Sequence, residues 1–117
     1  MPLAFRFHRF QFGPTKANPA SDSVTFGNLG GPVQQVLVAI SSFKFQYSTS
    51  DTTDRKIADH HLGVAHIETA VHEAGDSLEV FVTNFLLRDA SPSGDPKSAP
   101  DDFYEGFVDV QVLVETA

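Results

Sequence analysis

Cysteine and tryptophan are absent from this sequence of 117 residues, and the longest apolar run, Val36 to Ile40, is short. Without cysteine there is no disulfide framework, and the redox compartment is left open. A helix needs about 20 apolar residues to cross a bilayer, so no segment is expected to span a membrane. The opening residues MPLAFRFHRFQF are interrupted by Arg6, His8 and Arg9, which is not typical of a signal peptide.

Positive charge is also scarce, because 8 Lys and Arg residues stand against 15 Asp and Glu residues, a formal net charge of −7. Such a charge repels nucleic-acid phosphates and anionic lipids unless a basic patch overrides it. The densest positive cluster consists only of Arg6, His8 and Arg9. We therefore expect neither a nucleic acid nor a membrane as a partner.

Common enzyme motifs are missing as well. No serine lies in a Gly-x-Ser-x-Gly turn, and neither an HExxH motif nor a glycine-rich phosphate loop is present. The acidic residues Asp51, Asp54, Asp101 and Asp102 lie in polar segments, where no apolar surroundings would raise a carboxyl pKa. The sequence predicts a protein that is not an enzyme and that uses no cofactor.

Phenylalanine is abundant, with 11 residues, and 8 glycines and 7 prolines mark frequent turns. This composition predicts one all-β domain over residues 1–117, with an arm or strand and a loop in 1–22 and a core in 23–117. Strands are expected at 3–12, 23–26, 35–47, 60–73, 78–87 and 107–115, with loops at 13–22, 48–59 and 88–102.

Two of these strands have apolar residues on both faces. In 35–47 one expected face is Leu37, Ala39, Phe43, Phe45 and Tyr47, and the other begins with Val36, Val38 and Ile40. Segment 78–87 has the same character. Because a two-sheet sandwich buries one face of each strand, something else must cover the second face. A neighbouring subunit and the aromatic N-terminal arm are equally good candidates.

Four of the five histidines, His60, His61, His66 and His72, lie within thirteen residues. On a strand, His66, Glu68 and His72 share one face. Two histidines and a carboxylate can hold iron, but His66 and His72 are separated by roughly 20 Å of strand, too far for one ion. Loop histidines or symmetry copies could complete a site; the simpler interpretation is a partly exposed strand face.

Three blocks of sequence resemble the H-type lectin domain of snail agglutinins and the C-terminal domain of discoidins. They are SVTFGNLGGPVQQVLVAISSFKF, HHLGVAHIETAVHEAGDSLEVFVTNF and FVDVQVLVETA, and they cover residues 23–117 apart from the two long loops. The resemblance implies a six-stranded antiparallel β-sandwich that assembles as a homotrimer and binds carbohydrate.

The sugar-contacting positions of that family are different in this sequence. Lys44 stands where the family has an acidic residue, Gly63 where it has an arginine, and Asn84-Phe85 where it has a tryptophan-containing motif. The loops 48–59 and 88–102 are also longer. A ligand site at this edge would therefore differ from the family's own site.

A sugar site needs a flat apolar surface with fixed hydrogen-bonding groups beside it. We expect these groups to gather at one end of the sandwich. Phe85, Phe103 or Tyr104 would supply the surface, and the polar groups would come from His60, His61, Asn84, Arg88 and Asp89. The alternative is that Phe85 belongs to the core, that Tyr104 closes a strand, and that the polar residues are ordinary loop residues.

Together these features predict a non-enzymatic recognition module, with carbohydrate as the favoured ligand class and a homotrimer as the assembly. One alternative is a structural or assembly protein that kept a lectin-like scaffold without a sugar site. A small metal-binding protein is the third interpretation.

Overall fold

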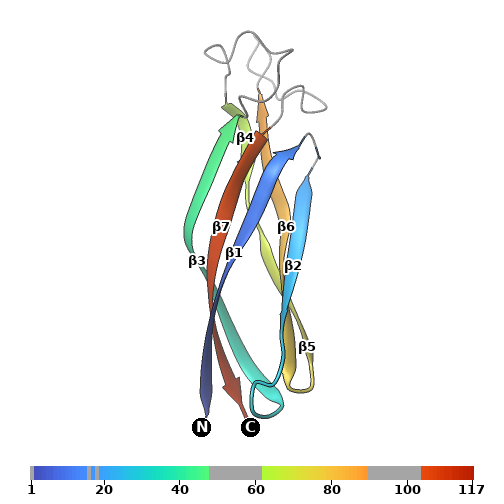
Figure 1. Ribbon diagram of the computed structural model, residues 1–117, viewed down its shortest axis with the longest axis vertical. Coiled ribbons are helices and arrows are strands. Elements are labelled where there is room, and N and C mark those ends of the chain that lie inside the picture. Colours follow the sequence, from blue (N-terminus) through green and yellow to red (C-terminus); the bar gives the residue numbers. More distant parts are fainter. Residues whose placement is uncertain (1, 16, 18, 48–61, 90–103) are drawn as a thin grey trace.

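A computed structural model describes residues 2–15, 17, 19–47, 62–89 and 104–117. These residues form two antiparallel sheets that pack face to face in an elongated molecule (Figure 1). The predicted all-β antiparallel sandwich is confirmed. No helix among the described residues could cross a membrane. The strands are β1 (Leu3–Thr15), β2 (Ala20–Phe26), β3 (Val33–Tyr47), β4 (Leu62–His66), β5 (Thr69–Ala74), β6 (Ser77–Asp89) and β7 (Tyr104–Thr116).

The first sheet has the strand order β1-β7-β3, and the second has β2-β6-β4, with β5 also paired to β6. Strands β4 and β5 pair with successive parts of β6, on the side away from β2. The seven described strands therefore fill six positions, three in each sheet. This agrees with the expected sandwich while dividing the histidine-rich strand at Ile67 and Glu68.

The N-terminal segment is an integral strand of the first sheet. Strand β1 pairs with β7 from Leu3 onward, and its register is regular as far as Phe12. Phe10 and Phe12 are buried, whereas Phe5 and Phe7 lie on the opposite, outer face and are exposed. The apolar residues of β1 therefore change from the outer face, with Phe5 and Phe7, to the inner face, with Phe10 and Phe12, without a bulge between them.

A bulge at Ser41 corrects the expected faces of β3. Ile40 pairs with Val110 and Ser42 with Asp109, so β3 advances two residues where β7 advances one. The predicted single face joining Leu37 and Ala39 to Phe43 and Phe45 is wrong, because the extra residue reverses the alternation. Beyond the bulge, Phe43 and Phe45 share the inner face with Val36 and Val38.

A second bulge, near Thr83 and Asn84, explains the doubly apolar pattern of β6. His66 of β4 pairs with Leu86 of β6, and Thr69 of β5 pairs with Val82 of β6. Between these two pairs, β6 therefore contains one residue more than the β4–β5 side. The shift puts Phe85 on the same inner face as Leu78, Val80 and Val82, all of which are buried. Most of the apolar residues that suggested a covering layer on β6 therefore belong to the sandwich's own core.

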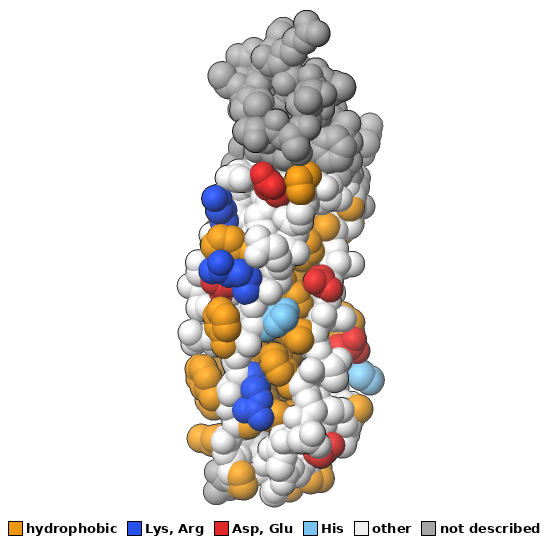
Figure 2. Space-filling model, viewed as in Figure 1, with side chains coloured by type: hydrophobic (Ala, Val, Ile, Leu, Met, Phe, Trp, Pro, Cys, Tyr) orange, Lys and Arg blue, Asp and Glu red, His pale blue; other side chains and the backbone are white. Residues whose placement is uncertain are grey.

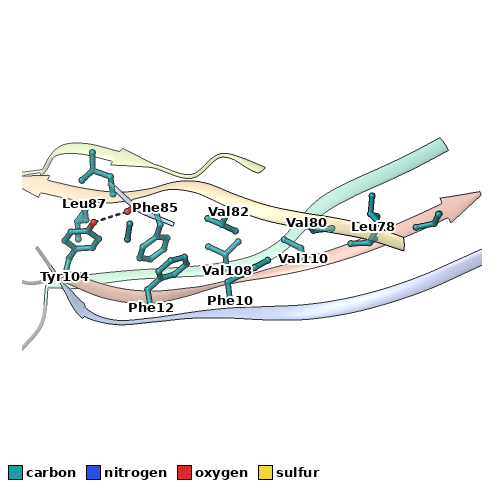
Figure 3. Packing of buried hydrophobic residues seen from close by; sticks show 14 of the residues in the cluster. Phe10, Phe12, Leu78, Val80, Val82, Phe85, Leu87, Tyr104, Val108 and Val110 are labelled. Atoms are coloured by element: carbon teal, nitrogen blue, oxygen red, sulfur yellow. Dashed lines mark hydrogen bonds between the residues drawn. The ribbon is translucent and has the colours of Figure 1, made fainter. Parts of the chain in front are cut away.

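Three aromatic rings stack over Gly106, which lies near the start of β7, the central strand of the first sheet. Gly106 pairs with Phe12 on one side and with Phe45 on the other. Because glycine has no side chain, a gap about two strand spacings wide, ~10 Å, separates the two phenylalanine rings. Phe85 enters this gap from the second sheet and stacks on Phe12 at 4.2 Å between ring centroids (Figure 3). On its other side it stacks on Phe45 at 4.5 Å.

Most of the remaining core side chains extend from this stack toward the other end of the sandwich, whereas Leu87 and Tyr104 lie on the opposite side of Phe85 (Figure 3). Four valines of β7 alternate inward and face buried residues of β6. The buried hydrophobic residues are Phe10, Phe12, Ala20, Leu29, Leu78, Val80, Val82, Phe85, Leu86, Leu87, Tyr104, Val108, Val110, Val112 and Val114.

Replacing Gly106 with alanine is expected to lower the free energy of unfolding by about 3 kcal/mol or more. A Cβ there would overlap the carbonyl oxygen of Lys44 and lie 3.0 Å from Cζ of Phe85. Gly13→Ala is the control, because no atom lies within 4 Å of its added Cβ, and we expect a change within about 0.5 kcal/mol. Urea denaturation measures the free energy of unfolding of both variants. Equal losses would contradict the requirement for glycine at position 106.

Candidate functional site

Two of the residues predicted for a ligand site belong to the buried core. Phe85 and Tyr104 are both fully buried, at 0% exposure, so neither presents a surface to a ligand. The Tyr104 hydroxyl donates to the carbonyl oxygen of Phe85 at 3.0 Å and also contacts that of Ala17, and burial raises its pKa. Their positions match the alternative interpretation, in which one is core and the other closes a strand.

The polar residues of the predicted site fall into two groups. Asn84 is described and partly buried on β6, within the bulge. Arg88 and Asp89 belong to the same strand, but their side chains are outside the described part of the structure, as are His60, His61 and Phe103 entirely. Only Asn84 can therefore be placed against other groups.

A cleft of about 670 Å³ opens at the side of the sandwich, between the edge strand β3 and the junction of β4 with β5. It lies where the β3 bulge turns the chain, and its walls are mainly apolar. Phe43 is 58% exposed and meets Phe45 edge-on, with ring centroids 6.0 Å apart. The lining residues are Ile40, Ser41, Ser42, Phe43, Phe45, Ala65, His66 and Ile67.

A polar network adjoins this cleft through His66, one of its lining residues. Nε2 of His66 lies 2.7 Å from Oε1 of Glu68. Asn84 on β6 donates from Nδ2 to Oε2 of the same carboxylate, also at 2.7 Å. The backbone fixes the arrangement, because the Thr83 amide donates to the carbonyl oxygen of Glu68 at 3.0 Å. The side chains of His66 and Asn84 are therefore joined through one carboxylate, that of Glu68.

The network favours a charged carboxylate. The hydrogen bond with His66, and next the one from Asn84, hold the pKa of Glu68 below its usual value of 4.5. His66 and Glu68 are both about half exposed, so water screens their attraction and the pair adds little to stability. Its main effect is to hold the imidazole in one position through Nε2.

The metal interpretation gains no support from the described residues. Among them, no group of three or more histidine and acidic side chains is arranged to hold an ion. His72 lies on β5 opposite Glu79, further along the sheet than the His66–Glu68 pair. The predicted shared face of His66, Glu68 and His72 thus contains one direct contact, between the first two.

Sequence reasoning missed Phe43 and the Ser41–Ser42 pair as site residues. The available signal was the interruption of the apolar alternation at Ser41 and Ser42, and again at Thr83 and Asn84. Polar residues inside a long apolar strand are typical of a bulge that redirects side chains. Both interruptions lie beside the cleft or its polar network.

Comparisons with protein-family models, with curated proteins and with solved structures found no match to this chain.

The Glu68 network should be visible in a pH titration. Because the pKa of Glu68 is lowered by folding, this contact stabilises the protein above pH 4.5, and its contribution is lost as the pH falls through the folded-state pKa. We expect NMR titration of the Glu68 carboxyl to give a midpoint below 4.5. His66→Ala should raise that midpoint more than Asn84→Ala does. A midpoint at or above 4.5 in the unmodified protein would refute the network.

Proposed function

We propose that this chain is a non-enzymatic recognition module that binds carbohydrate in the cleft between β3 and the β4–β5 junction. The observation that supports this proposal is the exposed ring of Phe43 in a cleft whose lining also includes the His66 end of a hydrogen-bonded polar network. The volume of about 670 Å³ lies within the range of small-molecule sites.

Phe43 supports the proposal because a flat, exposed ring matches the apolar C–H face of a sugar ring. A large aromatic side chain at 58% exposure is costly to leave in water, and a ligand that covers it gains apolar contact. Ile40 and Ile67 extend the apolar wall beside it.

The polar groups support a ligand that is rich in hydroxyls. Ser42 is exposed at the cleft, and Ser41 uses its hydroxyl to donate to the carbonyl oxygen of Asp109 at 3.3 Å. His66 lines the cleft, and its Nε2 is held by Glu68. Such fixed donors and acceptors beside an apolar surface give a sugar both orientation and specificity.

This site is not the one that the resemblance to H-type lectins implied. It uses Asn84 only indirectly, through Glu68, and it does not use Phe85 or Tyr104. Membership of that family remains part of the proposal, as does the ligand class. A role in assembly is the second candidate, and it is favoured by exposed phenylalanines on the outer face of the first sheet.

A glycan array followed by calorimetry with a free oligosaccharide tests the proposal. We expect binding by the unmodified protein and at least a tenfold loss of affinity in Phe43→Ala, which corresponds to about 1.4 kcal/mol for one lost aromatic contact. Phe81→Ala is the matched control, since Phe81 is a partly exposed phenylalanine of β6 in the second sheet and does not line the cleft.

Two results would overturn the proposal. A silent array at high protein concentration would remove carbohydrate as the ligand class. Unchanged affinity in Phe43→Ala would remove the cleft as the binding site, even if a sugar binds elsewhere on the molecule.

A further inference from the structure

We propose that two copies of this chain associate through the outer face of the β1-β7-β3 sheet. This face bears large apolar side chains that point away from the core. Their exposures are 65% for Leu3, 59% for Phe5, 56% for Phe7 and 62% for Leu37. Leu113 of β7 pairs with both Phe5 and Leu37, so the patch crosses all three strands. Figure 2 shows hydrophobic side chains at the surface of the lower part of the molecule.

The area of the patch matches what a stable dimer requires. Leu3, Phe5, Phe7 and Leu37 together leave on the order of 450 Å² of apolar surface in water. A standard interface buries about 800 Å² on each partner, of which roughly 60% is apolar. The patch therefore supplies most of the apolar share of one such interface, with the rest of the face available as a polar rim.

Face-to-face contact is favoured over pairing of strand edges. At one edge of the first sheet, β1 carries Arg6 and His8 on the face that points into the sandwich. At the other edge, β3 is interrupted by the bulge at Ser41. Inward-pointing charges and bulges are features by which proteins block edge-to-edge pairing. On the outer face, residues paired across the three strands form rows. Neither a charged residue nor a bulge interrupts the rows Phe5–Leu113–Leu37 and Phe7–Gln111–Ala39.

An ion pair marks where the apolar patch ends. Arg9 binds Asp109 through two hydrogen bonds of 2.7 and 2.8 Å and lies over the ring of Phe107, 4.0 Å from its centroid. Asp109 is almost buried, and the hydrogen bond from Arg9 lowers its pKa. The sheet therefore changes from an apolar surface to a charge-paired surface at this row.

Charge selects the relative direction of the two copies. The net charge is −7, and Glu115 is the one charged residue in the three described rows of the face that contain Leu3, Phe5 and Phe7. If the two copies packed with their strands parallel, about a two-fold axis that runs along β7, the Glu115 carboxylates of the two copies would lie close together. With the strands antiparallel, the Glu115 row of one copy faces the Arg9 row of the other, and Phe5 meets Phe7.

The geometry points to a dimer in place of the trimer that the sequence resemblance implied. A two-fold contact uses the same patch on both copies, whereas a closed ring joins two different surfaces of each chain. The apolar patch lies on a single surface, the outer face of the first sheet. The exposed residues Ile40 and Phe43 belong to the cleft at the β3 edge.

The mass in solution tests this proposal independently of sugar binding. We expect light scattering and sedimentation equilibrium to give twice the chain mass of 12.7 kDa. Phe5→Glu and Leu37→Glu, on different strands of the patch, should each give the monomer mass. Phe43→Glu is the matched control, with nearly the same exposure but a position in the cleft, and it should keep the dimer mass.

Loss of the dimer can be distinguished from unfolding by circular dichroism. Because Phe5 and Leu37 are exposed, each variant should keep the spectrum of the folded protein. A monomer mass for the unmodified protein, or a trimer mass, would overturn the proposal. So would a dimer that survives Phe5→Glu and Leu37→Glu, or one that Phe43→Glu dissociates.

Discussion

The insertion of Phe85 between Phe12 and Phe45, over Gly106, is the contact on which the rest of the sandwich depends. It joins both sheets and both edges of the first sheet at one point. The missing side chain of Gly106 is as necessary as the three rings, because only the gap admits the ring from the facing sheet. Tyr104 then ties the backbone of Phe85 to the start of β7 through its hydroxyl group.

The two bulges connect this core to the candidate site. The β6 bulge turns Phe85 inward, and it also places Asn84 where its amide reaches Glu68. The β3 bulge turns Phe45 inward onto Phe85 and leaves Phe43 beside the cleft. Each bulge thus serves packing on one side and the surface on the other, which is why a change in the core would alter the cleft.

Much of the architecture could be predicted from the sequence, because alternating apolar residues mark strands and frequent glycine and proline mark turns. The strand faces could not be, since one extra residue at Ser41 reverses the alternation and nothing local records which strand it pairs with. Asn84 was predicted as a polar site residue, whereas the aromatic beside it proved to be core. Phe43 was assigned to a strand face, because its exposure depends on a cleft formed by distant segments.

The pairing of β1 with β7 has a consequence for how the chain folds. Arg9 and Asp109 are 100 residues apart in sequence, and β7 is the only sheet partner of both β1 and β3 within the described strands. During synthesis, the aromatic residues of β1 therefore have no partner strand in the first sheet until β7 has been made. Such non-local topology slows folding and leaves apolar segments accessible during synthesis. The first sheet can therefore form only after β7 has been made, because β7 is its central strand.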